Sequence, residues 1–579
     1  MRDNSDNEIL IGLIVGGISN EFSKSVVKGI TSSIPKNSNI RLAILPGELM
    51  QENFQGEAVS QHNFMFNSVY NLGKICKMDG IIIAMGSIGW ALNDEQIKEF
   101  LNRYADIPSV LIASDYEEYT TVNYDNKMGI NETIEVLVGV YGITSIGMIG
   151  GYKENVDSNR RKDIFIECLE RSGIEYNEKL YVPSDMSENT DEAAALLLNQ
   201  NPDLKAVFCV NDASAVGLYR EMKRRRLVPG EDILVFGFDN TRMAAEMTPP
   251  LSSIGSSSVT LGQKSLELLL RKINGEKVDS ELIPTRLYGR ESLKYDKYEY
   301  SLSNLIYIDE EIINRMFDDC FYRYDTEYNK DSINLKRLFY EILNRIFKGI
   351  KRRYIGVDEF NEIGHLIDIF FSSGAMDYTD VWKFLKSVTE LQNGINKTLR
   401  GRENSFVNRL FLRMKDDALL SLSESRIKEN EENEIARESL RKFIIKGMNY
   451  AGDKAITKND IISSLATLGL DNAAFYMFDE PITMDDLERQ QYPDYIYLIS
   501  VIKSGNIYVI PEPKRKRFMS DIFIQREIKI YNKRFVTFPL FYEKLFYGLL
   551  LCELNEDVFS RGELIASQLG MMVHMIKIS

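Results

Sequence analysis

Residue types that build metal centres and covalent frameworks are scarce in this sequence. Among its 579 residues there are three histidines and five cysteines, and the cysteines form no CxxC pair. An odd number of widely spaced cysteines argues against a disulfide framework, and isolated histidines argue against a zinc site or a histidine-based triad. We therefore expect buried free thiols in a reducing compartment, and neither a metal nor a cofactor.

Long apolar runs and enzyme motifs are also missing. No apolar stretch approaches the ~20 residues that a membrane helix needs, and the polar start MRDNSDNE is unlike a secretory signal. There is no GxxxxGK[ST] phosphate loop, no GxSxG elbow, no HExxH and no GxGxxG after a predicted strand. These absences favour a cytoplasmic binding protein over an enzyme or a membrane protein.

The charge balance is acidic. The net charge is −15, from 70 basic and 85 acidic residues, and the short basic clusters stand among acidic neighbours. Nucleic acids and anionic membranes attract basic surfaces, so neither is expected as the main partner. We expect no direct DNA binding and no membrane association.

Residues 9–293 show a regular alternation of short apolar runs and amphipathic helical patterns. Runs that are too short for a core helix and apolar at consecutive positions are typical of strands buried on both faces. Strands that alternate with helices indicate an α/β fold with parallel sheets. The runs are Ile11–Gly17, Ile40–Gly47, Gly80–Gly86, Ser109–Ser114, Ser145–Gly151, Lys205–Asp212 and Asp232–Asp239.

Short polar side chains follow three of these predicted strands. Ser19 and Asn20 come after the first, Asn211 and Asp212 after the sixth, and Asp239 ends the seventh. Open parallel sheets bind ligands at the carboxyl ends of their strands, so these residues predict a site for a small polar molecule. For each residue alone, a helix cap or a turn is the alternative role.

The rest of the chain changes character twice. Residues 294–448 lose the strand pattern and carry apolar residues at helical spacing, which predicts a helical connector. Residues 449–579 contain aromatic and branched runs followed by an amphipathic helix, which predicts a small α+β domain. We expect the closing helix to support self-association through Leu564, Leu569, Met572, Val573 and Ile576.

Several segments of residues 9–293 together resemble the effector-binding core of LacI/GalR-type regulators. They include IGLIVGGISNEFSKSVVKGI, a V-x-x-D-N-x-x-G signature at 122–129, the segments VFCVND and VFGFDN, and the final RES at 290–292. The resemblance implies the two-lobed type I periplasmic-binding-protein fold, closing over a sugar-like metabolite. It implies lobe one from Ile9 to Ser114 plus Ala244 to Asn274, and lobe two from Val122 to Asp239 plus the final strand.

The same resemblance implies additional ligand-facing residues. It points to Asp125 in the signature and to an arginine that we place at Arg160, and Phe22 could stack on a sugar. Carboxylates accept hydrogen bonds from hydroxyls, whereas arginine donates them. Capping of a helix or turn is the alternative role for Asp125 and Asp239. The predicted ligand-binding set is Ser19, Asn20, Phe22, Asp125, Arg160, Asn211, Asp212 and Asp239.

The resemblance stops short of DNA recognition, because no helix-turn-helix pattern precedes Ile11. The order of core, helical connector and small α+β domain is similar to the input half of bacterial signalling proteins. In those proteins a GAF-like domain and a linker helix precede a diguanylate cyclase or another output module. The likeness to GAF domains rests on strand order and on the FPL and YGLLL segments, and no GGDEF or EAL-type sequence follows.

We therefore expect a cytoplasmic, homodimeric sensor that closes on a sugar-like metabolite and relays the change through helices to a protein output partner. Three alternatives stay open. The chain could be the shortened input region of a diguanylate cyclase or kinase, a transport-associated solute-binding protein, or a transcription regulator that acts without its own DNA-binding arm.

Overall fold

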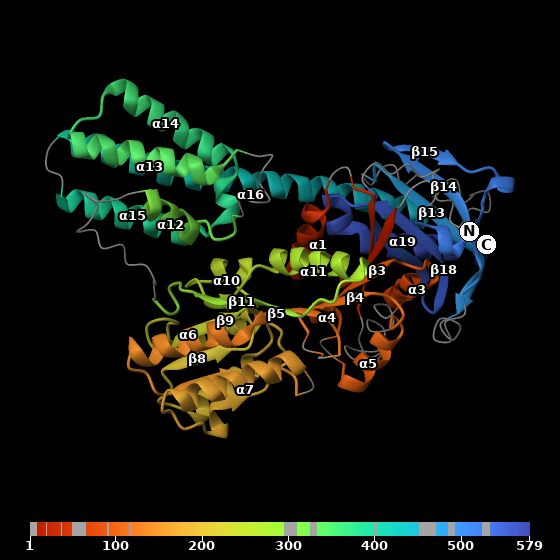
Figure 1. Cartoon of the computed structure of the whole chain (residues 1–579), viewed down its shortest axis with the longest axis horizontal. Coiled ribbons are helices and arrows are strands. Elements are labelled where there is room, and N and C mark those ends of the chain that lie inside the picture. Colours follow the sequence, from red (N-terminus) through yellow and green to blue (C-terminus); the bar gives the residue numbers. More distant parts are fainter. Residues whose placement is uncertain are drawn as a thin grey trace.

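The computed structural model describes residues 8–18, 20–35, 38–48, 65–89, 92–114, 116, 118–153, 155–294, 310–324, 333–398, 402–450, 470–483, 492–523 and 533–578. Figure 1 shows two α/β lobes, a helical region beside lobe two and a β region beside lobe one. The expected two-lobed α/β core is confirmed, with one sheet in each lobe.

Lobe one is built on parallel strands in the order β11-β5-β4-β3-β1-β2. One face of this sheet packs against helices α1 and α11, and the opposite face packs against residues 65–104. The strands are β1 (Ile9–Gly16), β2 (Ile40–Gly47), β3 (Gly80–Ala84), β4 (Ser109–Ile112), β5 (Thr121–Asp125) and β11 (Glu281–Pro284). The helices include α1 (Glu21–Ser33), η1 (Phe66–Asn71), α3 (Leu72–Ile75), α4 (Met85–Ile88), α5 (Asp94–Asn102) and α11 (Ser258–Ile273).

Lobe two has its own sheet, in the order β12-β10-β9-β8-β6-β7, in which β12 is antiparallel to β10. The strands are β6 (Ile146–Ile149), β7 (Tyr181–Val182), β8 (Ala206–Cys209), β9 (Leu234–Phe238), β10 (Ser252–Gly255) and β12 (Arg286–Tyr288). The helices are α6 (Asn126–Gly139), α7 (Val156–Arg171), η2 (Glu178–Leu180), α8 (Asp191–Gln200), α9 (Asp212–Arg224) and α10 (Arg242–Glu246).

The boundaries between the lobes differ from those that the resemblance implied. Strand β5 pairs with β4 and β11, so residues 121–125 belong to lobe one rather than to lobe two. Strand β10 pairs with β9 and β12, so α10 and β10 belong to lobe two rather than to lobe one. The chain therefore crosses after β5, between β10 and α11, and between β11 and β12.

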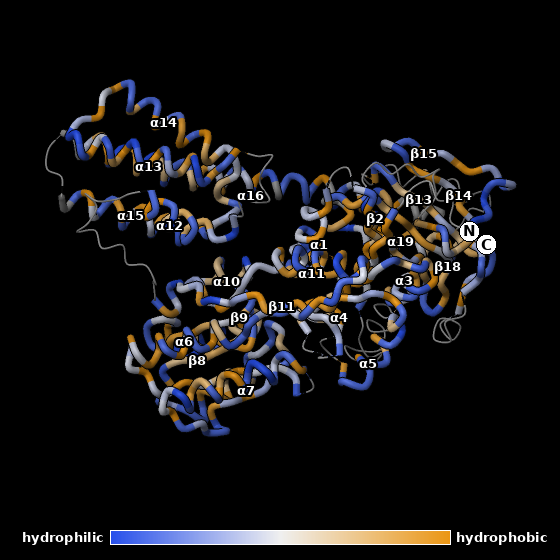
Figure 2. Tube along the Cα trace, in the orientation of Figure 1, coloured by the Kyte–Doolittle hydropathy of each residue, from blue (hydrophilic) through white to orange (hydrophobic). Residues whose placement is uncertain are grey.

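The helical connector expected after residue 293 is confirmed as a helical region with its own apolar core. Its elements are α12 (Glu310–Cys320), α13 (Leu335–Arg352), α14 (Val357–Ser372), η4 (Ala375–Tyr378), α15 (Val381–Thr398) and α16 (Arg402–Tyr450). Helix α16 is 49 residues long and runs from this region to the C-terminal strands (Figure 1). Its middle stretch is mostly exposed and hydrophilic (Figure 2), whereas Phe443 near its end is buried in the apolar cluster that lobe one shares with the C-terminal region.

The C-terminal region contains the expected strands and closing helix. They are β13 (Ala473–Thr483), β14 (Tyr495–Lys503), β15 (Asn506–Val509), β16 (Lys516–Phe518), β17 (Arg534–Tyr542), β18 (Leu545–Glu553) and α19 (Glu556–Ile578), with the short turns η6 (Glu512–Lys514) and η7 (Met519–Asp521). The sheet is antiparallel within this region.

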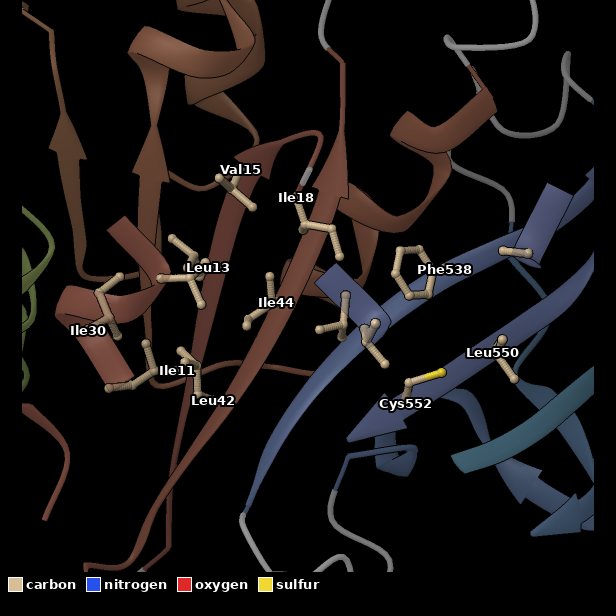
Figure 3. Packing of buried hydrophobic residues seen from close by; sticks show 14 of the residues in the cluster. Ile11, Leu13, Val15, Ile18, Ile30, Leu42, Ile44, Phe538, Leu550 and Cys552 are labelled. Carbon is tan, nitrogen blue, oxygen red and sulfur yellow. The ribbon is translucent and has the colours of Figure 1, made fainter. Parts of the chain in front are cut away.

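The C-terminal sheet is not separate from the rest of the molecule. Strand β17 pairs in parallel with β2, with Val536 opposite Ile44, and this pairing makes one 12-stranded sheet with lobe one. Ile44 and Phe538 lie in one apolar cluster across the junction (Figure 3). Sequence periodicity predicts strands but does not say which sheet edges meet, so this union was not foreseen.

The closing helix also differs from its expected role. Leu569, Met572 and Val573 are buried against the molecule's own sheet, whereas Leu564 is exposed. These three buried side chains are therefore unavailable for self-association, because they already pack on β17 and its neighbours.

Candidate ligand-binding cleft

A cleft of about 1470 Å³ lies between the two lobes. Lobe one contributes residues near the start of α1 and after β4, and lobe two contributes the loops after β6, β8 and β9. The position agrees with the rule that open α/β sheets bind ligands beyond the carboxyl ends of their strands. Central lining residues are Phe22, Ser25, Ala113, Ser114, Asn155, Asp157, Arg161, Asn211, Asp239 and Asn240.

Arg161 is the cation deepest in the lobe-two side of this lining. Its Nη2 lies 2.6 Å from Asp157 Oδ2, its Nη1 donates to the Val210 carbonyl at 2.7 Å, and Nη1 lies 3.4 Å from Asp239 Oδ1. The guanidinium also stacks 3.8 Å above the Phe238 ring. Its Nε is buried and has no hydrogen-bond partner among the described residues. The side chain is thus fixed in place as a donor at the cleft surface.

Asp239 is the carboxylate that faces Arg161. It follows β9 with φ at +100°, and Asn240 follows with φ at +50°, so two consecutive non-glycine residues adopt left-handed backbone conformations. Such conformations are uncommon and persist where the surrounding structure holds them. The Asp239 carboxylate remains accessible to a ligand, because its side chain is 41% exposed and lines the cleft.

Asp212 holds this strained loop from behind. Its carboxylate accepts from Thr241 N at 2.8 Å, from Thr241 Oγ1 at 2.9 Å and from Ser253 Oγ at 2.6 Å, and it is fully buried. A Cβ at Gly237 would lie 2.3 Å from Asp212 Oδ1, so glycine is required beside it. Asp212 therefore positions Asp239 and is not part of the cleft surface.

Burial shifts the protonation of both carboxylates. It raises the pKa of Asp212 to about 7, and the nearby charge of Asp239 adds to the rise while bonds from Ser253 and Thr241 oppose it. Desolvation by the surrounding protein also raises the pKa of Asp239, although its side chain is exposed to the cleft, and the guanidinium of Arg161 opposes this rise. Both aspartates therefore keep a proton up to a higher pH than ordinary aspartates do.

The structure divides the eight predicted ligand residues. Phe22, Asn211 and Asp239 line the cleft, and Asn211 also caps α9 by accepting from Ser214 N at 2.9 Å. Asn20 and Asp125 instead cap helices: Asn20 Oδ1 accepts from Ser23 N at 2.7 Å, and Asp125 Oδ1 accepts from Lys127 N at 3.1 Å. Asp212 is the buried brace described above, Arg160 is exposed outside the lining, and Ser19 lies outside the described residues.

Helical spacing explains the shift from Arg160 to Arg161. Helix α7 begins after its N-cap, Asn155, whose side chain accepts from Ser158 N at 2.7 Å. Its buried positions include Ser158, Arg161 and Phe165, at intervals of three and four residues. Residues at this spacing share one helix face, so the periodicity of the sequence already contained a signal for Arg161.

Seven tyrosines in the lining were missed by sequence reasoning. Tyr124, at the first crossover, hydrogen-bonds with Ser258 at the second, with 2.7 Å between the two oxygens. Others come from both lobes and from the helical region, which was not expected at the cleft. The set is Tyr116, Tyr124, Tyr152, Tyr288, Tyr322, Tyr324 and Tyr378.

A buried ion pair joins the cleft loop to the helical region. Arg290 follows β12, and its Nη2 lies 2.7 Å from Asp380 Oδ2 and donates to Asn240 Oδ1 at 2.6 Å. Tyr322 donates its hydroxyl to Asp380 Oδ1 at 2.8 Å. Burial acts to raise the pKa of Asp380, but Arg290 and Arg323 outweigh it and hold the pKa below its usual value. We call Asn240, Arg290, Tyr322 and Asp380 the polar joint.

Comparisons with known proteins agree with the fold of the N-terminal half. Residues 140–293 match the family described as periplasmic binding protein-like domain. The chain is 25% identical over 290 residues to catabolite control protein A of Priestia megaterium, across 49% of this chain and 81% of that protein. It is 24% identical over 267 residues to the ribose operon repressor of Escherichia coli (strain K12), across 45% of this chain and 75% of the repressor.

Among solved structures, the chain is similar to a transcriptional regulator CelR–cellobiose complex, with 22% identity and a TM-score of 0.41. The match covers 49% of this chain and 85% of that one. The family match and the two relatives support a LacI-type, periplasmic-binding-protein-like effector-binding domain, by distant similarity. The family match ends at residue 293, before the helical and C-terminal regions.

Among the described residues, no helix combines the length and the apolar character needed to cross a bilayer. Within the same residues, no group of three or more His, Cys, Asp or Glu side chains is arranged to hold a metal ion.

Proposed function

We propose that the protein is a regulatory sensor that binds a small, hydroxyl-rich metabolite of the sugar type between its two lobes. The observation that carries the proposal is the pairing of Arg161 with Asp239 in an aromatic-lined cleft. The relatives are a control protein and a repressor, which favours regulation over transport or catalysis.

The chemistry of the lining suits a sugar. Arg161 can donate to ring oxygens and hydroxyls, Asp239 can accept from hydroxyls, and Asn211 can donate its second amide hydrogen. Phe22 and the tyrosine rings offer apolar faces for the C–H face of a sugar ring. Charge-assisted hydrogen bonds inside a closing, water-poor cleft are stronger than neutral ones in water.

Signal relay would follow from closure of the lobes. A ligand shifts the open–closed balance through its differential affinity for the closed form, and coupling of about 1–3 kcal/mol changes the balance 5–150-fold. The helical region is attached to lobe two through the polar joint, and the C-terminal sheet is attached to lobe one through β17. Closure would therefore move these two regions relative to each other.

The finer parts of the proposal concern context. We place the sensor in the cytoplasm, as a homodimer that signals to a protein output partner. We also propose a GAF-like character for the C-terminal region, supported by its antiparallel order β15-β14-β13-β18-β17 with α19 packed on one face. Sedimentation of the full chain tests the dimer, and pull-down of partners from its native cell tests the relay.

Isothermal titration against a panel of saccharides and nucleosides tests the binding function. We expect a saccharide to bind, and we expect Arg161→Ala and Asp239→Ala to weaken its binding at least tenfold, because each removes a direct polar contact. Arg160→Ala is the matched control, since it removes the neighbouring, exposed guanidinium. Equal effects of Arg160→Ala and Arg161→Ala, or tight binding of no panel member, would contradict the proposal.

A further inference from the structure

One wall of the cleft comes from neither lobe. Tyr322, Arg323 and Tyr324 follow α12, and Asp377 and Tyr378 lie in η4, yet all five line the same cleft as the two lobes. We call these five residues the helical wall. The family match ends at residue 293, so the helical wall is a feature of this chain beyond the matched fold.

The helical wall is held in one arrangement by contacts of its own. Arg323 donates its backbone N–H to the Tyr378 carbonyl at 3.2 Å, and the rings of Tyr324 and Tyr378 meet edge to face with centroids 5.1 Å apart. Tyr322 packs against Tyr288 of lobe two with centroids 4.7 Å apart. A preformed surface loses little conformational freedom when a ligand binds to it.

The chemistry of the helical wall repeats that of the inter-lobe site. It offers aromatic faces, phenol hydroxyls, the guanidinium of Arg323 and the exposed carboxylate of Asp377. An aromatic face beside hydroxyl, guanidinium and carboxylate groups suits a ring that has apolar faces and a hydroxyl-bearing edge. A sugar ring has both of these features.

The size of the cleft exceeds the needs of one small ring. Sites for drug-sized ligands usually occupy about 300–1,000 Å³, whereas this cleft measures about 1470 Å³. A single ring bound beside Arg161 and Asp239 would make no contact with the helical wall. The helical wall lies near that site. Arg290 donates hydrogen bonds to both Tyr322 and Asn240, and Asn240 directly follows Asp239.

We propose that the helical wall is a second sugar subsite, so that the cleft selects saccharides of two or more rings over single-ring sugars. This inference rests on the proposed function, because the first ring occupies the site beside Arg161 and Asp239. The added ring would stack on Tyr378 and bond to Asp377 at its hydroxyl-bearing edge.

The test is isothermal titration of the full chain with saccharides of one to four rings built from glucose, galactose, xylose or N-acetylglucosamine. In the wild type we expect a two-ring saccharide to bind at least tenfold more tightly than its one-ring unit. Asp377→Ala and Tyr378→Ala should each weaken the binding of longer saccharides about tenfold and leave single-ring binding unchanged. Tyr378→Phe should keep the affinity, because it keeps the ring.

Matched controls come from the same helical region. Tyr354 and Asp358 are exposed and lie outside the cleft lining, so Tyr354→Ala and Asp358→Ala should change nothing. Asp377 is itself exposed, so its variant tests the subsite even if Tyr378→Ala folds poorly. Equal affinity for one-ring and longer saccharides, or variants that behave like the controls, would overturn the second subsite. Single-ring binding that still needs Arg161 would then leave the proposed function standing, whereas binding of no saccharide would overturn both.

Discussion

The two lobes are attached to the rest of the chain in opposite ways. Lobe one continues into the C-terminal region through the β2–β17 pairing, and both faces of the joined sheet share apolar clusters with that region. Lobe two meets the helical region at the polar joint, where Arg290 and Asp380 are almost fully buried. The helical region and lobe two keep separate apolar clusters.

This difference indicates which regions of the molecule should move as one body. An extended sheet with a shared apolar core spreads its stability over many contacts, so lobe one and the C-terminal sheet should act as one body. The contribution of a buried ion pair to stability depends on a few atoms and on their geometry, so the loss of one partner is costly. Helix α16 connects the helical region to the lobe-one body, because it packs in the helical region and buries Phe443 in the apolar cluster of lobe one and the C-terminal sheet.

A further contact links the lobe-one body to the cleft. Glu563 of α19 accepts a hydrogen bond from Ile18 N at 3.1 Å, in the loop between β1 and α1. Burial raises the pKa of Glu563, and the bond from Ile18 opposes this rise. The loop that leads to Phe22 is therefore held by the C-terminal region itself.

The largest expected effect breaks the polar joint. Asp380→Ala leaves the Arg290 guanidinium buried without its anion, which should lower the free energy of unfolding by about 3–5 kcal/mol. The matched control is Asp368→Ala, which removes an exposed ion pair with Arg413 in the same helical region and should cost about 0–1 kcal/mol. Urea unfolding of both variants measures the difference. Similar losses of unfolding free energy in the two variants would contradict a large contribution of the polar joint to stability.

A second effect sharpens the comparison through pH. Folded Asp212 keeps its proton up to about pH 7, whereas the unfolded chain releases it near about pH 3.9. The free energy of unfolding should therefore fall by about 2 kcal/mol as the pH rises from 5 to 7. Asp212→Asn should remove that slope, because an amide does not titrate in this range. The variant should still fold, since the amide can accept from Thr241 and donate to Ser253. Unfolding curves of wild type and variant at both pH values test this, and parallel slopes would count against a protonated Asp212.

The smallest expected effect probes the lobe-one junction. Ile44→Val deletes one methylene from the fully buried core between β2 and β17, and the free energy of unfolding should drop by about 0.5–1.5 kcal/mol. The same change at exposed Ile427 of α16 is the control and should stay within about 0.5 kcal/mol. If Ile44→Val cost as much as Asp380→Ala, the junction would not be distributed.

Local signals in the sequence predicted most elements but not their long-range partners. The longer strands that are apolar at consecutive positions were found. The strands that are short or carry polar residues were not, and these are β5, β7, β10, β11, β12 and β16. The helical region was predicted as helical, but its place at the cleft depends on Arg290 and Asp380, which are ninety residues apart. Pairing over such distances leaves no periodic trace in a single sequence.

The candidate site shows the same limit. Asp239 and Asn211 follow strands and line the cleft, although Asn211 also caps α9 by accepting from Ser214 N at 2.9 Å. Asn20 and Asp125 share that pattern but serve as helix caps, which sequence alone does not distinguish from ligand contact. The tyrosines of the helical wall carry no motif, so three-dimensional placement was needed to find them.

Ligand-dependent distances between spin labels test the central claim most directly. All five native cysteines are buried, so cysteines introduced at exposed positions can be labelled selectively. One pair joins Glu362 of the helical region to Asn506 of the C-terminal sheet, and the other joins Lys98 of lobe one to Asn506. On addition of the tightest-binding saccharide, we predict a changed distance for the first pair and an unchanged distance for the second. An unchanged first pair, or equal changes in both, would contradict a cleft that moves two bodies against each other.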